Sequence, residues 1–332
     1  MRVLAFISLV FTFGVSYAQL GDFQSLHRSF GARNAALGGK VVSLYDGDVT
    51  QFVHNPALLD TIQTGAVAFT YSPYFVDIHS LSSVYAGNFG KAGKLAIGVS
   101  YLDFGDFEGR MNNGDPDADF SANDLVFVVG KSHRISSFIL GTNLKFAIND
   151  IAGYGSSMLL ADIGGIYRAP NADFTVGMVF KNMGFLVSDY TGTNSGEVPF
   201  DVQISSTFKP RHMPFRFSLS AFNLNRDNLY FDSNEDELSS KNVEIANKIF
   251  RKINIGTELV LHESMQILFG YSHLLRQELK VGDVAYGAGI SFGFSLRIKQ
   301  FRLQYSHSKY HAAGGTNFFT LQTNINSFKK II

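Results

Sequence analysis

Residues 290–306, ISFGFSLRIKQFRLQYS, alternate between apolar and polar side chains in two runs that meet at Gln300. Alternation at every second residue is the pattern of a β-hairpin, because successive side chains of a strand point to opposite faces. The apolar face could form the core of a soluble sandwich, or it could contact lipid while the polar face lines the lumen of a membrane barrel. Features elsewhere in the chain distinguish between these two folds.

The first 18 residues have a charge at Arg2, an apolar run, and small residues at Ser16 and Ala18. This pattern predicts a secretory signal peptide that is cleaved before Gln19. The chain contains no Cys, so no disulfide stabilises the exported protein. No later apolar run is long enough for a transmembrane helix, which leaves the periplasm, the medium or a β-barrel in an outer membrane.

The composition favours the barrel. The 28 basic and 28 acidic residues balance, so no net charge attracts the chain to nucleic acid. Charged residues make up 17% of the chain, below the ~25% of typical soluble proteins, and there are 32 Phe and 14 Tyr. Few charges and many aromatic rings suit a surface in contact with lipid.

Fourteen segments have the alternating or mixed apolar character of a tilted strand of ~9–11 residues that spans a bilayer. They are 64–74, 80–90, 94–104, 123–132, 137–148, 156–168, 173–182, 199–209, 214–224, 252–262, 265–274, 284–298, 300–310 and 316–326. Every other link is short, and the intervening links are mostly longer, including 105–122, 149–155, 183–198, 225–251 and 275–283. Short turns on one side, long loops on the other and an even strand count are typical of outer-membrane barrels.

Strands that follow the short turns begin their apolar face at one level, which predicts an aromatic girdle at a membrane interface. These positions are Leu95, Phe138, Phe174, Phe215, Met265 and Phe301. The opposite face of the strands carries Lys145, Asp162, Lys181, Asp201, Arg216, Glu258, Arg297 and Arg302. Burying so many charges in a sandwich core is costly unless all are paired, whereas a lumen can hydrate them. The sequence thus predicts an all-β fold, a transmembrane antiparallel barrel of fourteen strands over 63–332, with the apolar set from Ile290 to Ile298 facing lipid.

Residues 19–62 lack strand alternation. They could form a solvated periplasmic tail, but Phe30, Leu37, Phe52 and Leu58 would then be exposed. We therefore expect this segment, called the hatch below, to fold back into the lumen.

Three runs in the hatch, ARNAALGG at 32–39, YDGD at 45–48 and HNPALL at 54–59, resemble the N-terminal signature of the FadL-like barrels. That resemblance implies a fourteen-stranded outer-membrane barrel with a hatch in which Asn55, Pro56 and Ala57 have a structural role. Within this superfamily, the length, the export signal and GYSHLLRQEL at 270–279 are most similar to the PorQ family of the type IX secretion system of Bacteroidetes.

The resemblance implies two alternative functions. A PorQ-like protein is a non-enzymatic scaffold of the attachment complex, which anchors a PorZ-like surface partner near PorU and PorV for cargo processing and attachment. A FadL-like protein is an outer-membrane channel for hydrophobic small molecules. The polar lumenal face predicted from the strands favours the scaffold. The segment 226–251, with an amphipathic helix in its second half, could pack over the barrel mouth or dock the partner.

Other motifs predict no further chemistry. Asp115, Asp117 and Asp119 alternate as in a calcium loop, but no bidentate Glu follows, so a surface loop is expected. His307 and His311 are four residues apart on a strand, a spacing that brings them to one metal only on a helix. No GxSxG elbow and no phosphate-binding glycine loop occur, so neither enzyme activity nor a cofactor is expected.

Overall fold

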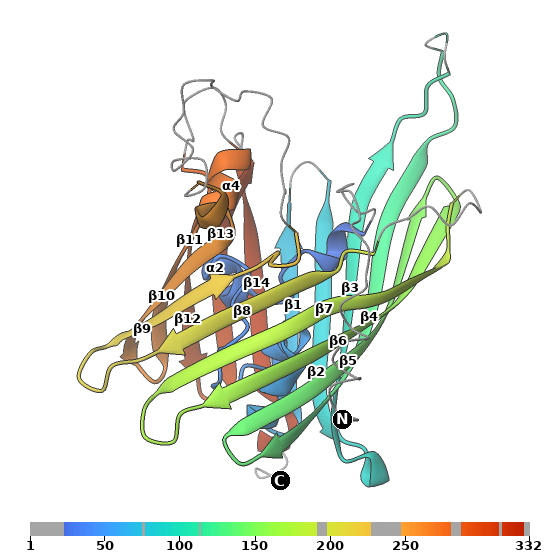
Figure 1. The fold of residues 1–332 in the computed structure, drawn as a ribbon. Helices are drawn as coiled ribbons and strands as arrows, with labels where there is room; N and C mark the ends of the chain where they lie inside the picture. Colours follow the sequence, from blue (N-terminus) through green and yellow to red (C-terminus); the bar gives the residue numbers. More distant parts are fainter. Residues whose placement is uncertain are drawn as a thin grey trace, which may run out of the picture.

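The chain folds into one closed β-barrel whose lumen contains the hatch (Figure 1). The structure, a computed structural model, describes residues 23–328 except 75–76, 112, 114, 191–197, 227–246, 280–286 and 312–313. The predicted signal peptide lies outside the described residues. Each strand pairs antiparallel with its sequence neighbours, and β1 pairs with β14 to close the barrel. The predicted fourteen-stranded antiparallel barrel is therefore confirmed.

The strands lie close to their predicted positions. They are β1 (Ala66–Pro73), β2 (His79–Asn88), β3 (Lys94–Phe107), β4 (Phe120–Ile135), β5 (Phe138–Ile151), β6 (Tyr154–Arg168), β7 (Phe174–Ser188), β8 (Asp201–Phe208), β9 (Phe215–Ala221), β10 (Ile253–His262), β11 (Met265–Ser272), β12 (Ile290–Ile298), β13 (Phe301–His311) and β14 (Gly314–Asn324). The helical segments are η1 (Gln24–Leu26), α2 (Ala32–Ala36), η2 (Val49–Val53), η3 (Pro56–Thr61), η4 (Gly90–Ala92), α4 (His273–Glu278) and η5 (Ile325–Ser327). Among the described residues, none of these helices has the length and apolar character needed to cross a bilayer.

The hairpin at 290–306 has the predicted sidedness. Phe292 is 46% exposed on the outer face, whereas the next residue back, Ser291, is 4% exposed on the lumenal face. Ile298 and Phe301 are cross-strand partners beside the turn at Lys299, whose φ of 55° suits a tight hairpin. The polar face is buried because the hatch fills the inside of the barrel. The apolar face therefore points to lipid.

The segregation of loops by length is weaker than predicted. The segment 149–155 is not a loop: β5 and β6 continue through it and join at Ala152 and Gly153, which both have positive φ. The two ends of 105–122, at 105–107 and 120–122, also continue β3 and β4. The strands β3 to β7 have 14 to 16 residues, whereas β8, β9 and β11 have 7 or 8. The five longer strands therefore form an extended wall on one side of the barrel, in which the β3–β4 hairpin reaches furthest from the short turns (Figure 1).

Candidate functional site

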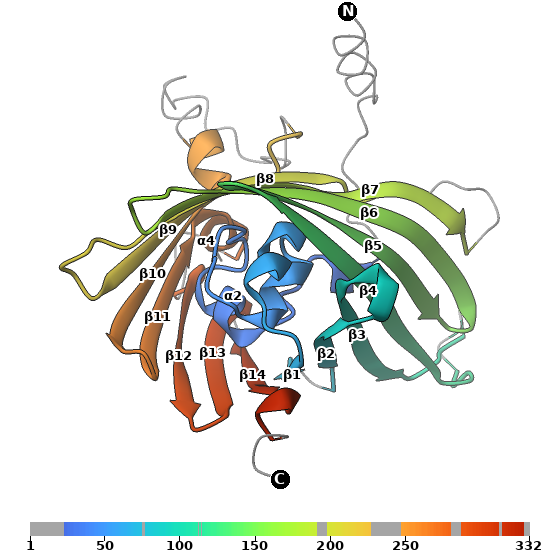
Figure 2. The same ribbon diagram turned by 90° about the horizontal axis from the view of Figure 1, so that it is seen from below.

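The candidate site is the lumen, which the hatch occupies. Seen along the barrel, α2 and the neighbouring 3-10 helices lie inside the ring of strands (Figure 2). All five residues of α2 and of η2 are buried. Glycines in the wall allow this close approach: a Cβ at Gly141 would collide with the backbone of Pro56 and Ala57, and one at Gly164 with the side chain of Asn55. The wall of β5 and β6 is thus shaped to the hatch.

The Asn-Pro-Ala run begins η3 and fixes it to the wall. Asn55 is the N-cap, and its Oδ1 accepts a hydrogen bond from the backbone of Ala57 at 3.1 Å. Pro56 takes the first helical position, where its missing N–H leaves no donor unsatisfied. The Asn55 Nδ2 donates to the carbonyl oxygens of Val42 at 2.9 Å and of Gly165 in β6 at 3.3 Å. One side chain therefore joins two parts of the hatch to the barrel.

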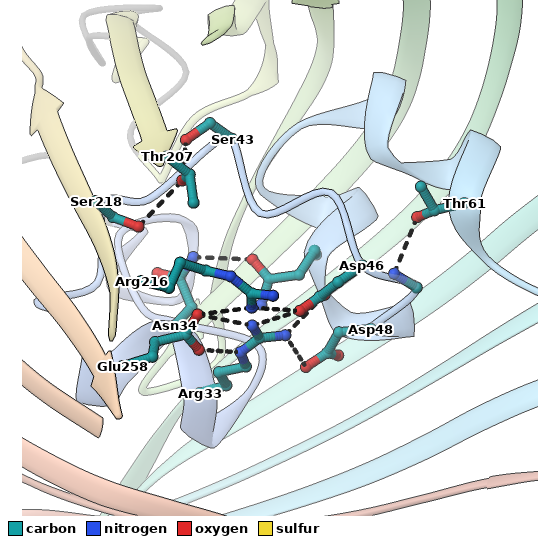
Figure 3. Close-up of polar contacts among 12 residues, drawn as sticks. Arg33, Asn34, Ser43, Asp46, Asp48, Thr61, Thr207, Arg216, Ser218 and Glu258 are labelled. Atoms are coloured by element: carbon teal, nitrogen blue, oxygen red, sulfur yellow. Dashed lines mark hydrogen bonds and ion pairs between the residues drawn. The ribbon is translucent and has the colours of Figure 1, made fainter. Parts of the chain in front are cut away.

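A cluster of buried charges joins the hatch to the opposite wall (Figure 3). Arg33 of α2 donates from Nε to Oε1 of Glu258 at 2.8 Å and from Nη2 to Oε2 at 3.1 Å. The same guanidinium pairs with Asp46 at 2.5 Å. Arg216 donates to Asp46 at 3.0 Å and to Glu258 at 2.9 Å. Two guanidiniums thus balance two carboxylates across the hatch, β9 and β10.

The hatch groups of this cluster stay charged. Burial opposes the charge of Arg33, but Asp46 and Glu258 outweigh it and raise the pKa of Arg33 well above its usual value. Burial alone would raise the pKa of Asp46, yet Arg33 and Arg216 hold that pKa well below its usual range. The ion pairs therefore persist at physiological pH.

Lys145 and Asp162 form a second buried pair, with 2.7 Å between Nζ and Oδ2. Asp162 also accepts a hydrogen bond from the backbone of Asn182 at 2.8 Å, at a β-bulge where Asn182 has a φ of 57°. Asn143 donates to Asp162 at 3.1 Å and to the carbonyl oxygen of Phe52 in the hatch at 3.0 Å. Lys145 and Asp162 therefore stabilise the local shape of the barrel wall, and the amide of Asn143 connects Asp162 to the hatch.

Lys181 and Asp201 are cross-strand partners on β7 and β8. His54 of the hatch lies near this group and is only 3% exposed. Burial lowers the pKa of His54 well below its usual value, and the charges of Lys181, Lys145 and Lys40 add to this effect. Among the described residues, its Nε2 has no hydrogen-bond partner. His54 is therefore held neutral in a positively charged environment.

The last two predicted charges lie near the short-turn end of the lumen. Arg297 of β12 and Arg302 of β13 are directly opposite each other and line a polar pocket that Asp46 also lines. The structure thus groups the eight predicted charges as Arg216 with Glu258, Lys145 with Asp162, Lys181 with Asp201, and Arg297 with Arg302.

The sequence interpretation missed the hatch partners of these charges. Arg33 and Asp46 lie within the ARNAALGG and YDGD runs, which by themselves indicate only a family resemblance. Asp48 caps η2 and accepts a hydrogen bond from Gln304 at 2.9 Å. The available signal was the presence of charged residues in a segment that is otherwise apolar and small, since a charge buried in a lumen requires a partner on the wall.

The lumenal face is not polar throughout, which corrects the expectation from the sequence. Along β1 to β6 it packs with the hatch into one hydrophobic cluster. Its residues are Phe23, Leu26, Phe30, Val49, Phe52, Val53, Leu59, Ile62, Ala66, Ala68, Val84, Ala86, Ala96, Val126, Val128, Ala147, Met158 and Leu160. The charges predicted as lumenal concentrate on β5 to β13, so the lumen has an apolar side and a polar side.

Other predicted positions lie away from the lumen. Asp115, Asp117 and Asp119 are in an exposed loop, where each accepts a hydrogen bond from a nearby group. Within the described part of the chain, no three acidic or His side chains are grouped to hold a metal. His307 contacts Phe292 and Asn317. Of the segment 226–251, residues 227–246 lie outside the described residues, and 247–251 are helical with Ile249 and Phe250 exposed.

Comparison with known proteins identifies the fold. No family model and no curated protein matches the sequence. The solved structures that match include the monoaromatic hydrocarbon channel TodX, with a TM-score of 0.50 and 12% identity over 89% of this chain and 97% of that one. They also include the Ralstonia pickettii toluene transporter TbuX, with a TM-score of 0.49 and 11% identity over 90% and 99%. A Pseudomonas aeruginosa FadL homologue has a TM-score of 0.47 and 9% identity over 89% and 98%.

At these identities the comparison concerns the fold alone. The likeness to TodX extends over nearly the whole length of both chains. Together with the closed ring of fourteen strands, it gives this protein the fold of the FadL-type outer-membrane barrels.

Proposed function

We propose that this protein is an outer-membrane channel for small hydrophobic molecules and that the hatch is its gate. The observation that carries the proposal is the hydrophobic cluster between the hatch and strands β1 to β6. At the outer end of the barrel it includes Phe23 and Met158, with Leu186 and Val198 packed against it. At the short-turn end it includes Ile62 and Ala66. An apolar seam thus runs from one end of the lumen to the other.

The two sides of the hatch differ in how they are held. On the polar side, Arg33 and its partners form directional ion pairs with β9 and β10. On the apolar side, hydrophobic contacts dominate and are non-directional, and the ion pair of Asp60 with Arg134 of β4 is partly exposed at the short-turn end. A hydrophobic solute can replace them without leaving a buried charge unpaired. The seam is therefore the side on which the hatch can separate from the wall while remaining anchored. The fold shared with TodX, a monoaromatic hydrocarbon channel, supports this function.

Engineered disulfides test which side opens, because the chain has no Cys of its own. A Cβ at Gly98 would lie 3.7 Å from Cγ2 of Val53, so Val53→Cys with Gly98→Cys should close a disulfide across the seam. Ser43→Cys with Ser205→Cys is the matched pair on the polar side, where the two Oγ atoms are 2.7 Å apart.

The measurement is uptake of radiolabelled toluene by intact cells that express each variant. We expect the protein to accelerate toluene uptake but not glucose uptake. Oxidation of the seam pair should abolish the acceleration, and reduction should restore it, while oxidation of the polar pair should leave it unchanged. Equal toluene uptake with and without the protein would contradict the channel function.

A second candidate, the PorQ-like scaffold, is favoured by the wall formed by β3 to β7. A strand of ~9–11 residues spans a bilayer, so strands of 14 to 16 residues extend beyond it. Phe107 and Phe120 stack near the end of this wall with ring centroids 5.2 Å apart, and both are exposed. Exposed aromatic rings outside lipid are typical of protein interfaces.

In this role the protein would anchor a PorZ-like surface partner near PorU and PorV. Deleting the gene and fractionating the cells distinguishes the two functions. The scaffold requires that the surface partner and the secreted cargo be lost from the cell surface. Normal cargo attachment with impaired toluene uptake would exclude the scaffold and support the channel.

A further inference from the structure

A polar pocket of about 330 Å³ lies at the short-turn end of the lumen, between the hatch and the wall. The hatch contributes Asp46, Gly47 and Thr61 to its lining, and Gln63, just after the hatch, also lines it. Strands β12, β13 and β14 and the turn between the first two contribute the remaining polar side chains, chiefly Arg297, Lys299, Arg302, Gln322 and Asn324. The pocket adjoins the seam at Ala66, which belongs to both, but the inference below does not depend on the proposed channel function.

The pocket contains a pair of like charges. Arg297 and Arg302 are cross-strand partners, and like charges directly opposite each other destabilise a sheet. Lys299 lies in the hairpin turn that connects them. Three cationic side chains thus line one small pocket.

No described residue forms a direct ion pair with these cations, although the carboxylates of Asp48 and Asp46 act on Arg302 through space. Neither Arg297 nor Arg302 makes a side-chain ion pair or hydrogen bond within the described part of the chain. Asp46, which lines the pocket, is already paired with Arg33 and Arg216. The side chains that line the pocket therefore carry an excess of positive charge.

Its remaining lining supplies hydrogen-bonding groups. Gln322 is 9% exposed, and its Oε1 has no partner among the described residues. Gln300 adds a further amide group, whereas Thr61 and Asn324 already make hydrogen bonds within the protein. A buried amide oxygen without a partner costs free energy, which a ligand with a hydroxyl group or a bound water would recover.

We propose that this pocket binds a small molecule that carries a phosphate group. Arginine forks bind phosphate oxygens through paired hydrogen bonds, and two of them with a lysine match a dianion better than the single charge of a carboxylate. The phosphate could belong to a free solute from the periplasm or to a lipid headgroup, since both present the same oxygens. The volume leaves room for a short polar group beside the phosphate.

Titration calorimetry on the full-length barrel in detergent tests the site, with glycerol 3-phosphate as the probe and glycerol as the uncharged comparison. We expect saturable binding of the phosphate only. Arg297→Gln and Arg302→Gln should each weaken it at least about tenfold, because each removes a charge-assisted hydrogen-bond donor. Arg211→Gln, in another turn at the same end, should bind as the unmodified protein does. Heat-dependent gel mobility shows that each variant is folded.

A second arm distinguishes the sources of the phosphate. If nanodiscs of phosphatidylglycerol displace glycerol 3-phosphate and nanodiscs of phosphatidylcholine do not, the natural ligand is a lipid headgroup. If neither displaces it, the natural ligand is a solute. Absence of saturable binding to the folded barrel, or equal binding by the two arginine variants and the unmodified protein, would overturn the proposal.

Discussion

Arg33 of the hatch and Glu258 of β10 form a two-point ion pair, with Nε 2.8 Å from Oε1 and Nη2 3.1 Å from Oε2, although 225 residues separate them. Both side chains are at most 1% exposed. This pair, reinforced by Asp46 and Arg216, is the main electrostatic connection between the hatch and the barrel.

Glu258→Gln should loosen the hatch without preventing the barrel from closing. Removing one partner of a buried ion pair costs about 3–5 kcal/mol, because the other charge stays buried and loses its counterion. The measurement is the rate at which a protease cleaves the hatch in the folded barrel. Glu263→Gln, the same change at an exposed turn, is the control and should not alter the rate. Equal protection of the hatch in both variants would mean that the pair does not hold it.

Periodicity explains why the strands were predictable and the site was not. From Ile290 to Ile298, alternation fixes both the strand and its two faces, because a strand has only two faces. The same alternation marks Glu258 as lumenal but cannot show that Arg33 contacts it, since that contact depends on how the hatch folds in three dimensions. The helix α4 was also missed: Ser272 caps only six helical residues, too few for a detectable helical period.

The closeness of the hatch to β6 can be tested at Gly164. A Cβ there would collide with Oδ1 of Asn55, so Gly164→Ala should force the cap of η3 away from the wall. Overpacking of this kind costs about 1–3 kcal/mol. Gly155→Ala in the same strand is the control, because no atom lies within 4 Å of its added Cβ. We expect faster hatch proteolysis for the first variant only; similar rates for both would show that the wall tolerates a methyl group.

Phe292→Arg should destabilise the barrel in lipid. A charge on the lipid face near the middle of the bilayer costs about 2–4 kcal/mol, and Phe292 lies on the outer face of β12. Urea titration of the protein folded into phospholipid vesicles measures the loss. Phe107→Arg, at the end of the raised wall, should have little effect because this part of β3 extends beyond the bilayer. A comparable loss for Phe107→Arg would place the wall within the membrane.

The hatch should bind less tightly to the wall as the pH falls below about 6.5. A displaced His54 would have the ordinary His pKa of ~6.5, whereas burial and the nearby lysines lower its pKa in the docked hatch. The displaced state therefore binds more protons in this range, and docking weakens by up to ~1.4 kcal/mol per pH unit. Asp46 does not interfere, because its pKa in the displaced state is the ordinary ~3.9, so its stabilising contribution begins to be lost only as the pH approaches that value, below the range tested.

Hatch proteolysis measured between about pH 7.5 and about pH 5, and normalised at each pH to an unfolded reference peptide, should accelerate toward the acidic end. His54→Gln retains a polar side chain of similar size but does not titrate, so its normalised rate should rise toward acid much less than that of the unmodified protein, with only His27 of the hatch left to respond. His262→Gln changes an exposed His at the end of β10 and should keep the pH dependence of the unmodified protein. If His54→Gln accelerates with acid as strongly as the unmodified protein, another group must control the docking of the hatch.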